Sequence, residues 1–298
     1  MILDFMFNYK LINKKPYLLI FNGIIYSSLA LFMSLIVFRS YASMVMVFFT
    51  VMACIPLVYN TIKHEEHEDI VLKSEISKLR EHAKALSKFM YLFLGFVLAF
   101  SFWYLAMPDS LTHDGFQSQM EAIHQINGGI EYYENNNVET DKLNGNLLRV
   151  GFPVFLSILL NNTVVMAFCL IFSLVYGLGA IFILTWNASV IGAAIGSIIK
   201  NGLSQVASYT GAHKIISMSA VVLNGFLRFT LHGIPEIAAY FIAGLAGGIV
   251  SVAVIKHDLK SKRFRKVIFD ALDLAFISAV LIVISAFIEV YITPVFFF

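Results

Sequence analysis

Residues 163–185 read TVVMAFCLIFSLVYGLGAIFILT, an apolar stretch without a charged side chain. A helix needs roughly 20 consecutive apolar residues to cross the hydrocarbon core of a bilayer, so this stretch alone predicts a membrane span. The composition of the whole chain agrees. Of its 298 residues, 59% are hydrophobic and 13% are charged, whereas about a quarter of the residues in a soluble domain are charged. The sequence therefore predicts an all-α protein that crosses the membrane several times.

Seven apolar stretches are expected to cross the membrane. Only three residues separate the first two stretches, which we therefore expect to form a tight hairpin. We expect the fifth stretch to cross the membrane as an unusually short span. Asn187 is expected to end the fourth span. Residues 215–230 are only moderately apolar and are expected to be re-entrant or to lie on the outer surface. The predicted spans are residues 17–37, 41–59, 89–107, 163–185, 188–199, 237–255 and 268–292.

The chain divides into three predicted parts. Residues 1–61 contain the N-terminal transmembrane hairpin, and residues 62–88 form a charged, amphipathic linker. Residues 89–298 form a membrane core of five spans. Within this core, residues 108–149 form an acidic insert that is rich in turn residues and contains one short helix at most.

The distribution of lysine and arginine predicts the orientation of the chain. These residues gather at the N-terminus, in the linker and in residues 256–266. Because cytoplasmic loops carry an excess of Lys and Arg, we expect these three segments, and thus the N-terminus, to lie inside the cell. The acidic insert and the C-terminus then lie outside, and the protein is a multi-pass component of the cytoplasmic membrane.

Polar side chains occur where the chain is otherwise apolar. His232 and Glu236 are four residues apart, so they share a face of any helix that contains both, and an ionisable group at membrane depth is commonly functional. A structural interpretation stays open: Pro235 favours the first position of a helix, and Glu236 would then interact well with the helix dipole near the outer interface. The candidate polar cluster comprises Asn161, Asn162, Asn187, Arg228, His232, Gly233, Glu236 and Glu289.

Two pairs of glycines, Gly192 with Gly196 and Gly244 with Gly248, lie four residues apart within the spans, and Gly177 and Gly179 lie nearby. Small residues at such positions let helix backbones approach one another closely. We expect these glycines to serve packing inside the bundle, with dimerisation as the alternative.

Other kinds of chemistry find little support in the sequence. Residues 64–68 read HEEHE, which lacks the HExxH spacing of zinc proteases and is typical of a solvated linker. His232 and Glu236 alone are too few ligands for a zinc site. There is no phosphate-binding loop, and no basic, aromatic surface of the kind that binds nucleic acid. We therefore expect no cofactor, no metal and no nucleic-acid partner.

Three motifs occur in order in residues 161–196, 231–248 and 281–294. They are two asparagines that open a Gly-rich span, an HGxxE motif before a small-residue helix, and a final span ending in AFIEVYITP. Together with the basic loop after the second stretch, they resemble the stage II sporulation protein M family over roughly residues 89–294. The resemblance implies a five-span membrane core with an external loop. The residues that match its motifs are Asn161, Asn162, Gly177, Gly179, Asn187, Gly192, His232, Gly233, Glu236, Gly244, Gly247 and Glu289.

Three functions remain open. The resemblance implies a non-enzymatic membrane scaffold or assembly factor for cell-envelope remodelling, since the founding member anchors cell-wall hydrolases during spore formation. Its partners would be the lipid bilayer and other envelope proteins, among them a cell-wall hydrolase where the host has peptidoglycan, and a homo-oligomer is an alternative. The second function is a transporter or channel component with a polar cavity around His232 and Glu236. The third is an intramembrane enzyme that uses these two residues.

Overall fold

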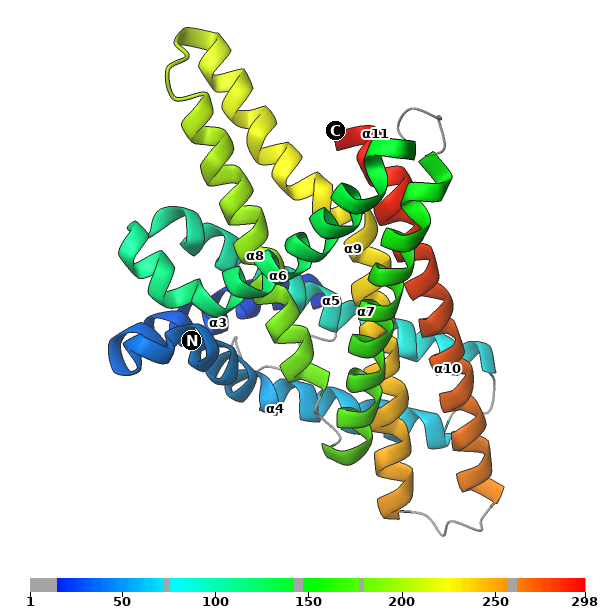
Figure 1. Ribbon diagram of the computed structural model, residues 1–298. Coiled ribbons are helices and arrows are strands. Elements are labelled where there is room, and N and C mark those ends of the chain that lie inside the picture. The colour runs from blue at the N-terminus through cyan, green and yellow to red at the C-terminus, as the bar shows by residue number, and fades with distance from the viewer. Residues whose placement is uncertain (1–14, 72–74, 142–146, 177–179, 257–261, 298) are drawn as a thin grey trace.

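The computed structural model describes residues 15–71, 75–141, 147–176, 180–256 and 262–297 (Figure 1). These residues are almost entirely helical and include no strand. Seven of their helices are long and apolar enough to cross a membrane. The predicted all-α bundle of about seven spans is thereby confirmed, and the orientation of its termini stays a prediction.

The helices follow one another with short connections. A 3-10 turn, η1 (Pro16–Leu18), begins the described chain, and a second, η2 (Arg39–Tyr41), joins the first two long helices. The last helix continues through a π-helical turn, η4 (Ile288–Ile292), into a short terminal helix, α11 (Thr293–Phe297). The long helices are α3 (Leu19–Val37), α4 (Ala42–Val71), α5 (Glu75–Ala106), α6 (Asp109–Asp141), α7 (Leu147–Tyr176), α8 (Ala180–Gln205), α9 (Gly211–Lys256) and α10 (Lys262–Phe287).

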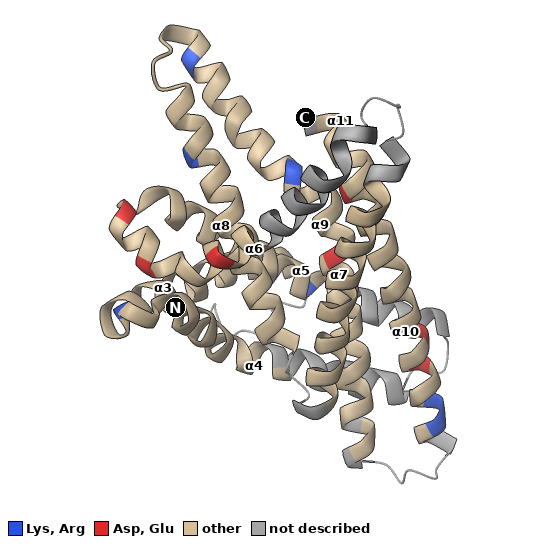
Figure 2. Cartoon of the chain, in the orientation of Figure 1, with Lys and Arg blue, Asp and Glu red and all other residues tan. Residues whose placement is uncertain are grey.

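The long helices form two groups that cross each other in Figure 1. In the first group α3 packs on α4 and α5, whereas α7, α9 and α10 pack side by side in the second. α8 contacts α5 as well as α7 and α9, and so joins the groups. Figure 2 shows long stretches of α7, α8 and α10 without charged side chains. One continuous apolar core runs through both groups, from Phe96 and Phe100 of α5 to Tyr240 of α9.

The N-terminal hairpin is present as predicted. Its buried hydroxyl groups donate to carbonyl oxygens of their own helices: Ser27 to Gly23 at 2.7 Å and Thr50 to Met46 at 2.7 Å. This arrangement suits a membrane, where polar groups must find partners within the protein. α3 and α5 approach so closely that a Cβ on Gly23 would lie 2.5 Å from the carbonyl oxygen of Leu92.

The expectation of a turn-rich insert is wrong over Asp109–Asp141, which forms the helix α6 with a kink at Phe116. Its first half packs on the bundle through polar contacts. The amide of Gln119, which is fully buried, donates to the carbonyl oxygen of Ser43 at 3.0 Å and lies 3.1 Å from the hydroxyl of Ser189. These hydrogen bonds join α6 to α4 and α8. They explain why the segment is ordered, because a buried amide contributes to stability only when it has partners.

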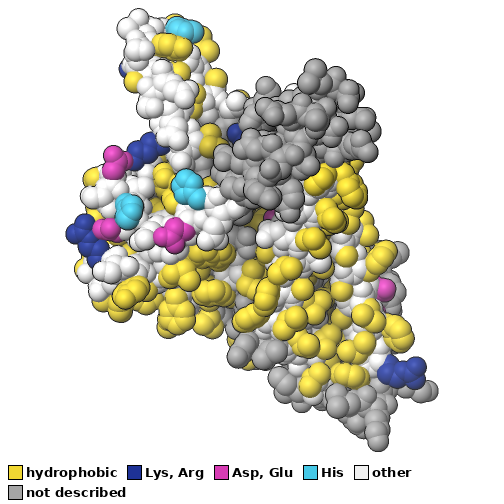
Figure 3. All heavy atoms as spheres, viewed as in Figure 1, with side chains coloured by type: hydrophobic (Ala, Val, Ile, Leu, Met, Phe, Trp, Pro, Cys, Tyr) yellow, Lys and Arg dark blue, Asp and Glu magenta, His cyan; other side chains and the backbone are white. Residues whose placement is uncertain are grey.

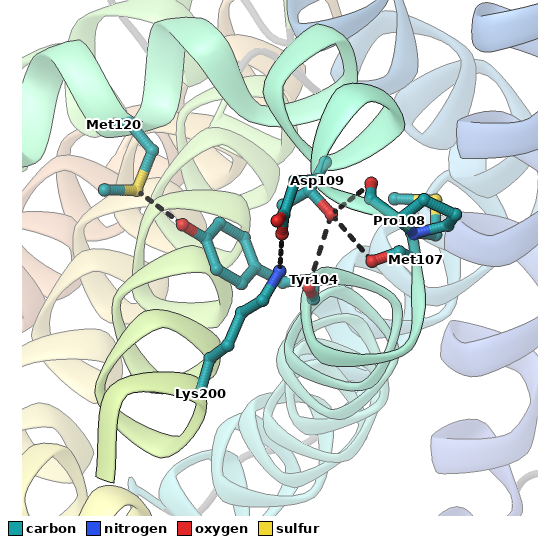
Figure 4. A network of polar contacts seen from close by, with 7 residues as sticks. Tyr104, Met107, Pro108, Asp109, Met120 and Lys200 are labelled. Atoms are coloured by element: carbon teal, nitrogen blue, oxygen red, sulfur yellow. Dashed lines mark hydrogen bonds and ion pairs between the residues drawn. The ribbon is translucent and has the colours of Figure 1, made fainter. Parts of the chain in front are cut away.

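Ion pairs complete the attachment of α6. Asp109 pairs with Lys200 of α8, beside the hydrogen bond of Tyr104 with the Met120 sulfur (Figure 4). Arg39 donates to Asp114 at 2.7 Å, and this hydrogen bond holds the pKa of the Asp114 carboxyl below its usual value. The ion pair is therefore strongest above the usual pKa of an aspartate, and it weakens as the pH falls and the carboxylate is protonated.

The predicted bounds of the fourth and fifth spans are wrong. α7 begins at Leu147 and ends at Tyr176, and α8 begins at Ala180, so the stretch 163–185 is divided between two helices. Asn187 does not end a span. It lies within α8, where its amide donates to the carbonyl oxygen of Ile183 at 2.8 Å. Because an asparagine can bond to its own helix in this way, its polarity alone does not mark a helix end, and the fifth span has full length.

The predicted helix start at residues 232–236 is also wrong. α9 is 46 residues long and contains Pro235 in its interior. It includes residues 215–230, which therefore form continuous helix and not a re-entrant segment. At 1.5 Å per residue α9 is about 69 Å long, more than twice the roughly 30 Å of a hydrocarbon core. Figure 1 shows that its yellow first part leans away from its orange second part, as expected for a helix bent at an interior proline.

Glycines lie where helices of the bundle approach closely. A Cβ on Gly192 would lie 2.6 Å from Cβ of Phe100, and one on Gly196 would lie 2.7 Å from Cβ of Tyr104, both on α5. A Cβ on Gly244 would lie 2.7 Å from that of Ala180, and one on Gly247 would overlap the carbonyl oxygen of Leu170. Gly248 is buried beside it. Gly177 and Gly179 lie outside the described residues.

Replacing Gly247 by alanine is expected to destabilise the protein by about 1–3 kcal/mol, the usual cost of adding volume to a packed interior. The new methyl group would meet backbone atoms of α7, which cannot move aside without shifting the helix. Thermal unfolding of the purified protein in mild detergent measures the change.

Gly233→Ala is the matched control in the same helix, because a Cβ on Gly233 would meet nothing within 4 Å. Its stability should be unchanged or slightly higher, since alanine favours a helix more than glycine does. Equal stability of the two variants would show that α7 and α9 do not pack at Gly247 as described.

Candidate functional site

α9 and α10 are joined by hydroxyl groups that reach from one helix to the backbone of the other. The Ser285 hydroxyl donates to the carbonyl oxygen of His232 at 2.9 Å, and the Ser278 hydroxyl donates to that of Ala239 at 2.7 Å. Both serines are fully buried. These bonds set the register of the two helices.

This register brings three ionisable side chains together. Nitrogen of His232 and carboxylate oxygens of Glu236 and Glu289 all lie within 4.8 Å of one another. His232 is buried, and the two glutamates are half-buried. The three residues, which we call the His–Glu–Glu cluster, come from α9 and from η4. They are the only such metal-capable group of three among the described residues.

The cluster is held by neighbouring polar groups. The Tyr240 phenol, one turn after Glu236 on α9, donates to Oε1 of Glu236 at 2.8 Å. The Thr293 hydroxyl lies 3.4 Å from Nδ1 of His232 and donates to the carbonyl oxygen of Ile288 at 3.1 Å. Tyr240 and Thr293 are both buried. Buried hydroxyl groups of the protein thus hold the side chains of His232 and Glu236.

The backbone around Glu289 is unusual. Ile288–Ile292 forms a π-helical turn inside an otherwise α-helical segment, a feature that is rare and frequently found at functional sites. Tyr291 of this turn packs against Phe155 of α7, with ring centroids 6.3 Å apart. Within this turn Glu289 faces α9 and Tyr291 faces α7.

The other predicted cluster residues lie elsewhere. Asn161 and Asn162 lie in the middle of α7, where the amide of Asn161 donates to Oδ1 of Asn162 at 3.3 Å. Asn187 lies on α8 and bonds within it. Arg228 is half-buried on α9, one turn before His232, and Gly233 faces open space. The described contacts therefore reduce the candidate set of eight residues to a compact group of three, with Arg228 nearby.

Sequence reasoning missed the residues that support the cluster. Tyr240 follows Glu236 by four residues, so helical spacing alone could have identified it. Thr293 and Ser285 have no such signal, because their partner His232 is far away in the chain. The buried Gln119 was missed as well, since the insert was expected to be turn-rich and not packed.

The chemistry of the cluster is that of a cation or proton site. An imidazole nitrogen and two carboxylates are ligands for divalent metals of the zinc type, and the same three groups can bind and release protons. Burying a single charged carboxylate in a membrane costs free energy. Burying two that face each other costs more, unless a positive charge or a proton lies between them. The geometry therefore favours binding of a positively charged species.

Asn162→Leu is expected to raise the stability of the protein by about 1 kcal/mol. Asn162 is 5% exposed, and its Nδ2 has no hydrogen-bond partner in the described part of the chain, so removal of the amide removes an unsatisfied buried group. Thermal unfolding in mild detergent measures the change. Asn161→Leu is the control, because it removes the hydrogen bond between the two amides but leaves Nδ2 of Asn162 in place. A clear loss of stability in Asn162→Leu alone would show that Nδ2 of Asn162 has a partner.

Comparisons with known proteins agree with the resemblance seen in the sequence. The model of the stage II sporulation protein M family matches residues 89–294, which include α7, α8, α9 and the whole His–Glu–Glu cluster. An uncharacterized protein of the archaeon Methanocaldococcus jannaschii is 37% identical over 150 residues, which are 49% of this chain and 73% of that protein. No solved structure matches the chain. The chain therefore belongs to the stage II sporulation protein M family.

Proposed function

We propose that this protein is an integral membrane scaffold or assembly factor for cell-envelope remodelling. Family membership supports this role, because the founding member is a scaffold of that kind. The structural observation that carries the proposal is a projecting helical hairpin, residues 200–224, which we call the arm. It consists of the end of α8 and the start of α9, and Figure 1 shows it leading away from the rest of the bundle.

The arm is built as a rigid element. A Cβ on Gly202 would lie 2.6 Å from Cγ1 of Val221, so its two helices are closely apposed. At the tip, Gly211 adopts a φ of 60°, a value that suits glycine far better than other residues. The rings of Tyr209 and His213 stack there at 4.7 Å. At the base, Lys200 pairs with Asp109 of α6.

The surface of the arm suits a protein partner. None of residues 200–224 is buried, and Ile215, Ile216 and Leu223 are 69%, 67% and 60% exposed. Exposed polar side chains such as Ser219 and Asn224 lie among them. Figure 3 shows this mixed character on the visible face of the arm, in contrast to the yellow apolar surface along the body below it. Mixed surfaces of this kind are typical of protein interfaces, whereas lipid-facing surfaces are more uniformly apolar.

The proposed setting is the cytoplasmic membrane, with the N-terminus inside the cell and the C-terminus outside. An odd number of spans is consistent with this arrangement, and the lysines and arginines of residues 256–266 support an inside position for the loop between α9 and α10. Other envelope proteins are the proposed partners, among them a cell-wall hydrolase where the host has peptidoglycan. A homo-oligomer is an additional arrangement that the arm would permit.

Photo-crosslinking in cells tests the scaffold. A photoreactive amino acid at Ile216 or Leu223 of the arm is expected to yield a discrete adduct with an envelope protein, identified by mass spectrometry. The matched controls are Phe276 and Ile284 on α10, which are also exposed but belong to the apolar body. Adducts with lipid alone at the arm positions, or the same adducts at all four positions, would contradict the proposal.

The His–Glu–Glu cluster favours a second candidate function, movement of protons or cations across the membrane. Ionisable groups inside transmembrane bundles commonly mark such pathways. Liposomes that contain the purified protein are expected to show a flux of protons or divalent cations, and Glu236→Gln should abolish it because the substitution removes one charge of the cluster. Glu121→Gln, an exposed glutamate on α6, should keep the flux. A rate no higher than that of empty liposomes would exclude this function.

A further inference from the structure

We propose that His232, Glu236 and Glu289 are the protein ligands of a divalent metal site of the zinc class, placed between α9 and η4 within the membrane bundle. The inference does not depend on the proposed function, since a scaffold and a transporter can each contain a metal site. It rests on the position of three ligand-bearing side chains, on their charge and on the groups that orient them.

The spacing of the three side chains suits one ion. Their ligand atoms lie within 4.8 Å of one another, and the ligand atoms of a tetrahedral zinc site, about 2 Å from the metal, lie about 3.3 Å apart. Side-chain rotations of Glu236 and Glu289 can make up this difference of about 1.5 Å. Because His232 and Glu236 are one helical turn apart and Glu289 approaches from another helix, the three ligands surround a common point.

Charge balance also favours a divalent ion. Glu236 and Glu289 both lie in segments apolar enough to span a membrane, where unbalanced charge is costly. Two carboxylates contribute two negative charges and the imidazole none, so a divalent cation makes the site neutral as a whole.

The neighbouring groups resemble those that support metal ligands. Metal-binding histidines and carboxylates usually make a further hydrogen bond that fixes their orientation. The Thr293 hydroxyl beside Nδ1 of His232 is such a group, and the Tyr240 phenol donates to Oε1 of Glu236 at 2.8 Å. Ser285 holds the backbone of His232 itself. Buried hydroxyl groups thus position Glu236 and His232.

The ligand types identify the class of metal. Mg²⁺ and Ca²⁺ prefer sites made of oxygen atoms alone, whereas an imidazole nitrogen favours zinc and similar first-row metals. Three protein ligands leave the fourth position of a tetrahedral zinc site open to water or another molecule. The structure therefore assigns an open zinc-type site and not a closed structural site with four protein ligands.

Metal content and cobalt spectroscopy of the full-length protein in mild detergent test the site. The wild type is expected to retain zinc in stoichiometric amount, as measured by plasma mass spectrometry. After removal of the metal with a chelator, added Co²⁺ should produce visible absorption bands of a tetrahedral site. Glu236→Gln, Glu289→Gln and His232→Gln should each lose the zinc and the bands, and Thr293→Val should weaken zinc affinity by about 10- to 100-fold.

Glu121→Gln and His213→Gln replace an exposed glutamate and an exposed histidine outside the cluster, and both should bind metal like the wild type. A wild type that binds neither zinc nor Co²⁺ would overturn the proposal. So would cluster variants that are folded and bind as much metal as the wild type. If the cluster variants fail to fold, the wild-type measurements still decide. Absence of metal together with higher thermal stability of Glu289→Gln would mean that the two carboxylates share a proton instead.

Discussion

Inside a bilayer every backbone polar group must find its partner within the protein, and α9 continues over 46 residues without ending although Pro235 lies within it. An aqueous environment would allow the chain to leave the helix at Gly233 and Pro235. Here the helix bends at the proline and continues. Two consequences depend on this continuity: His232 and Glu236 share one face, and the first part of α9 remains helical far enough to form the arm with α8.

Close packing of helices at glycines holds the two helix groups together. α8 lies against α5 at Gly192 and Gly196, and α9 lies against α7 at Gly247. Lipid supplies no hydrophobic force that drives membrane helices together, so their association depends on such close contacts and on hydrogen bonds. The buried hydroxyl and amide contacts, such as that of Gln119 with Ser43, supply the second component.

The bend of α9 at Pro235 lies between two residues of the His–Glu–Glu cluster, because His232 precedes the proline and Glu236 follows it, and the start of the same helix belongs to the arm. A change in this bend would therefore alter the direction of the arm.

Hydropathy was sufficient to predict an all-α membrane bundle of about seven spans, and the family motifs were sufficient to single out His232, Glu236 and Glu289, which the structure brings together. These features are local or compositional, because each depends on the residue types within one turn or one span. The tertiary structure alone decided where α7 ends, that α9 continues through Pro235, and that α6 is helical. It also decided that Thr293 and Glu289 meet His232. Such contacts depend on the register between helices, which is set by packing and buried hydrogen bonds between residues far apart in the chain.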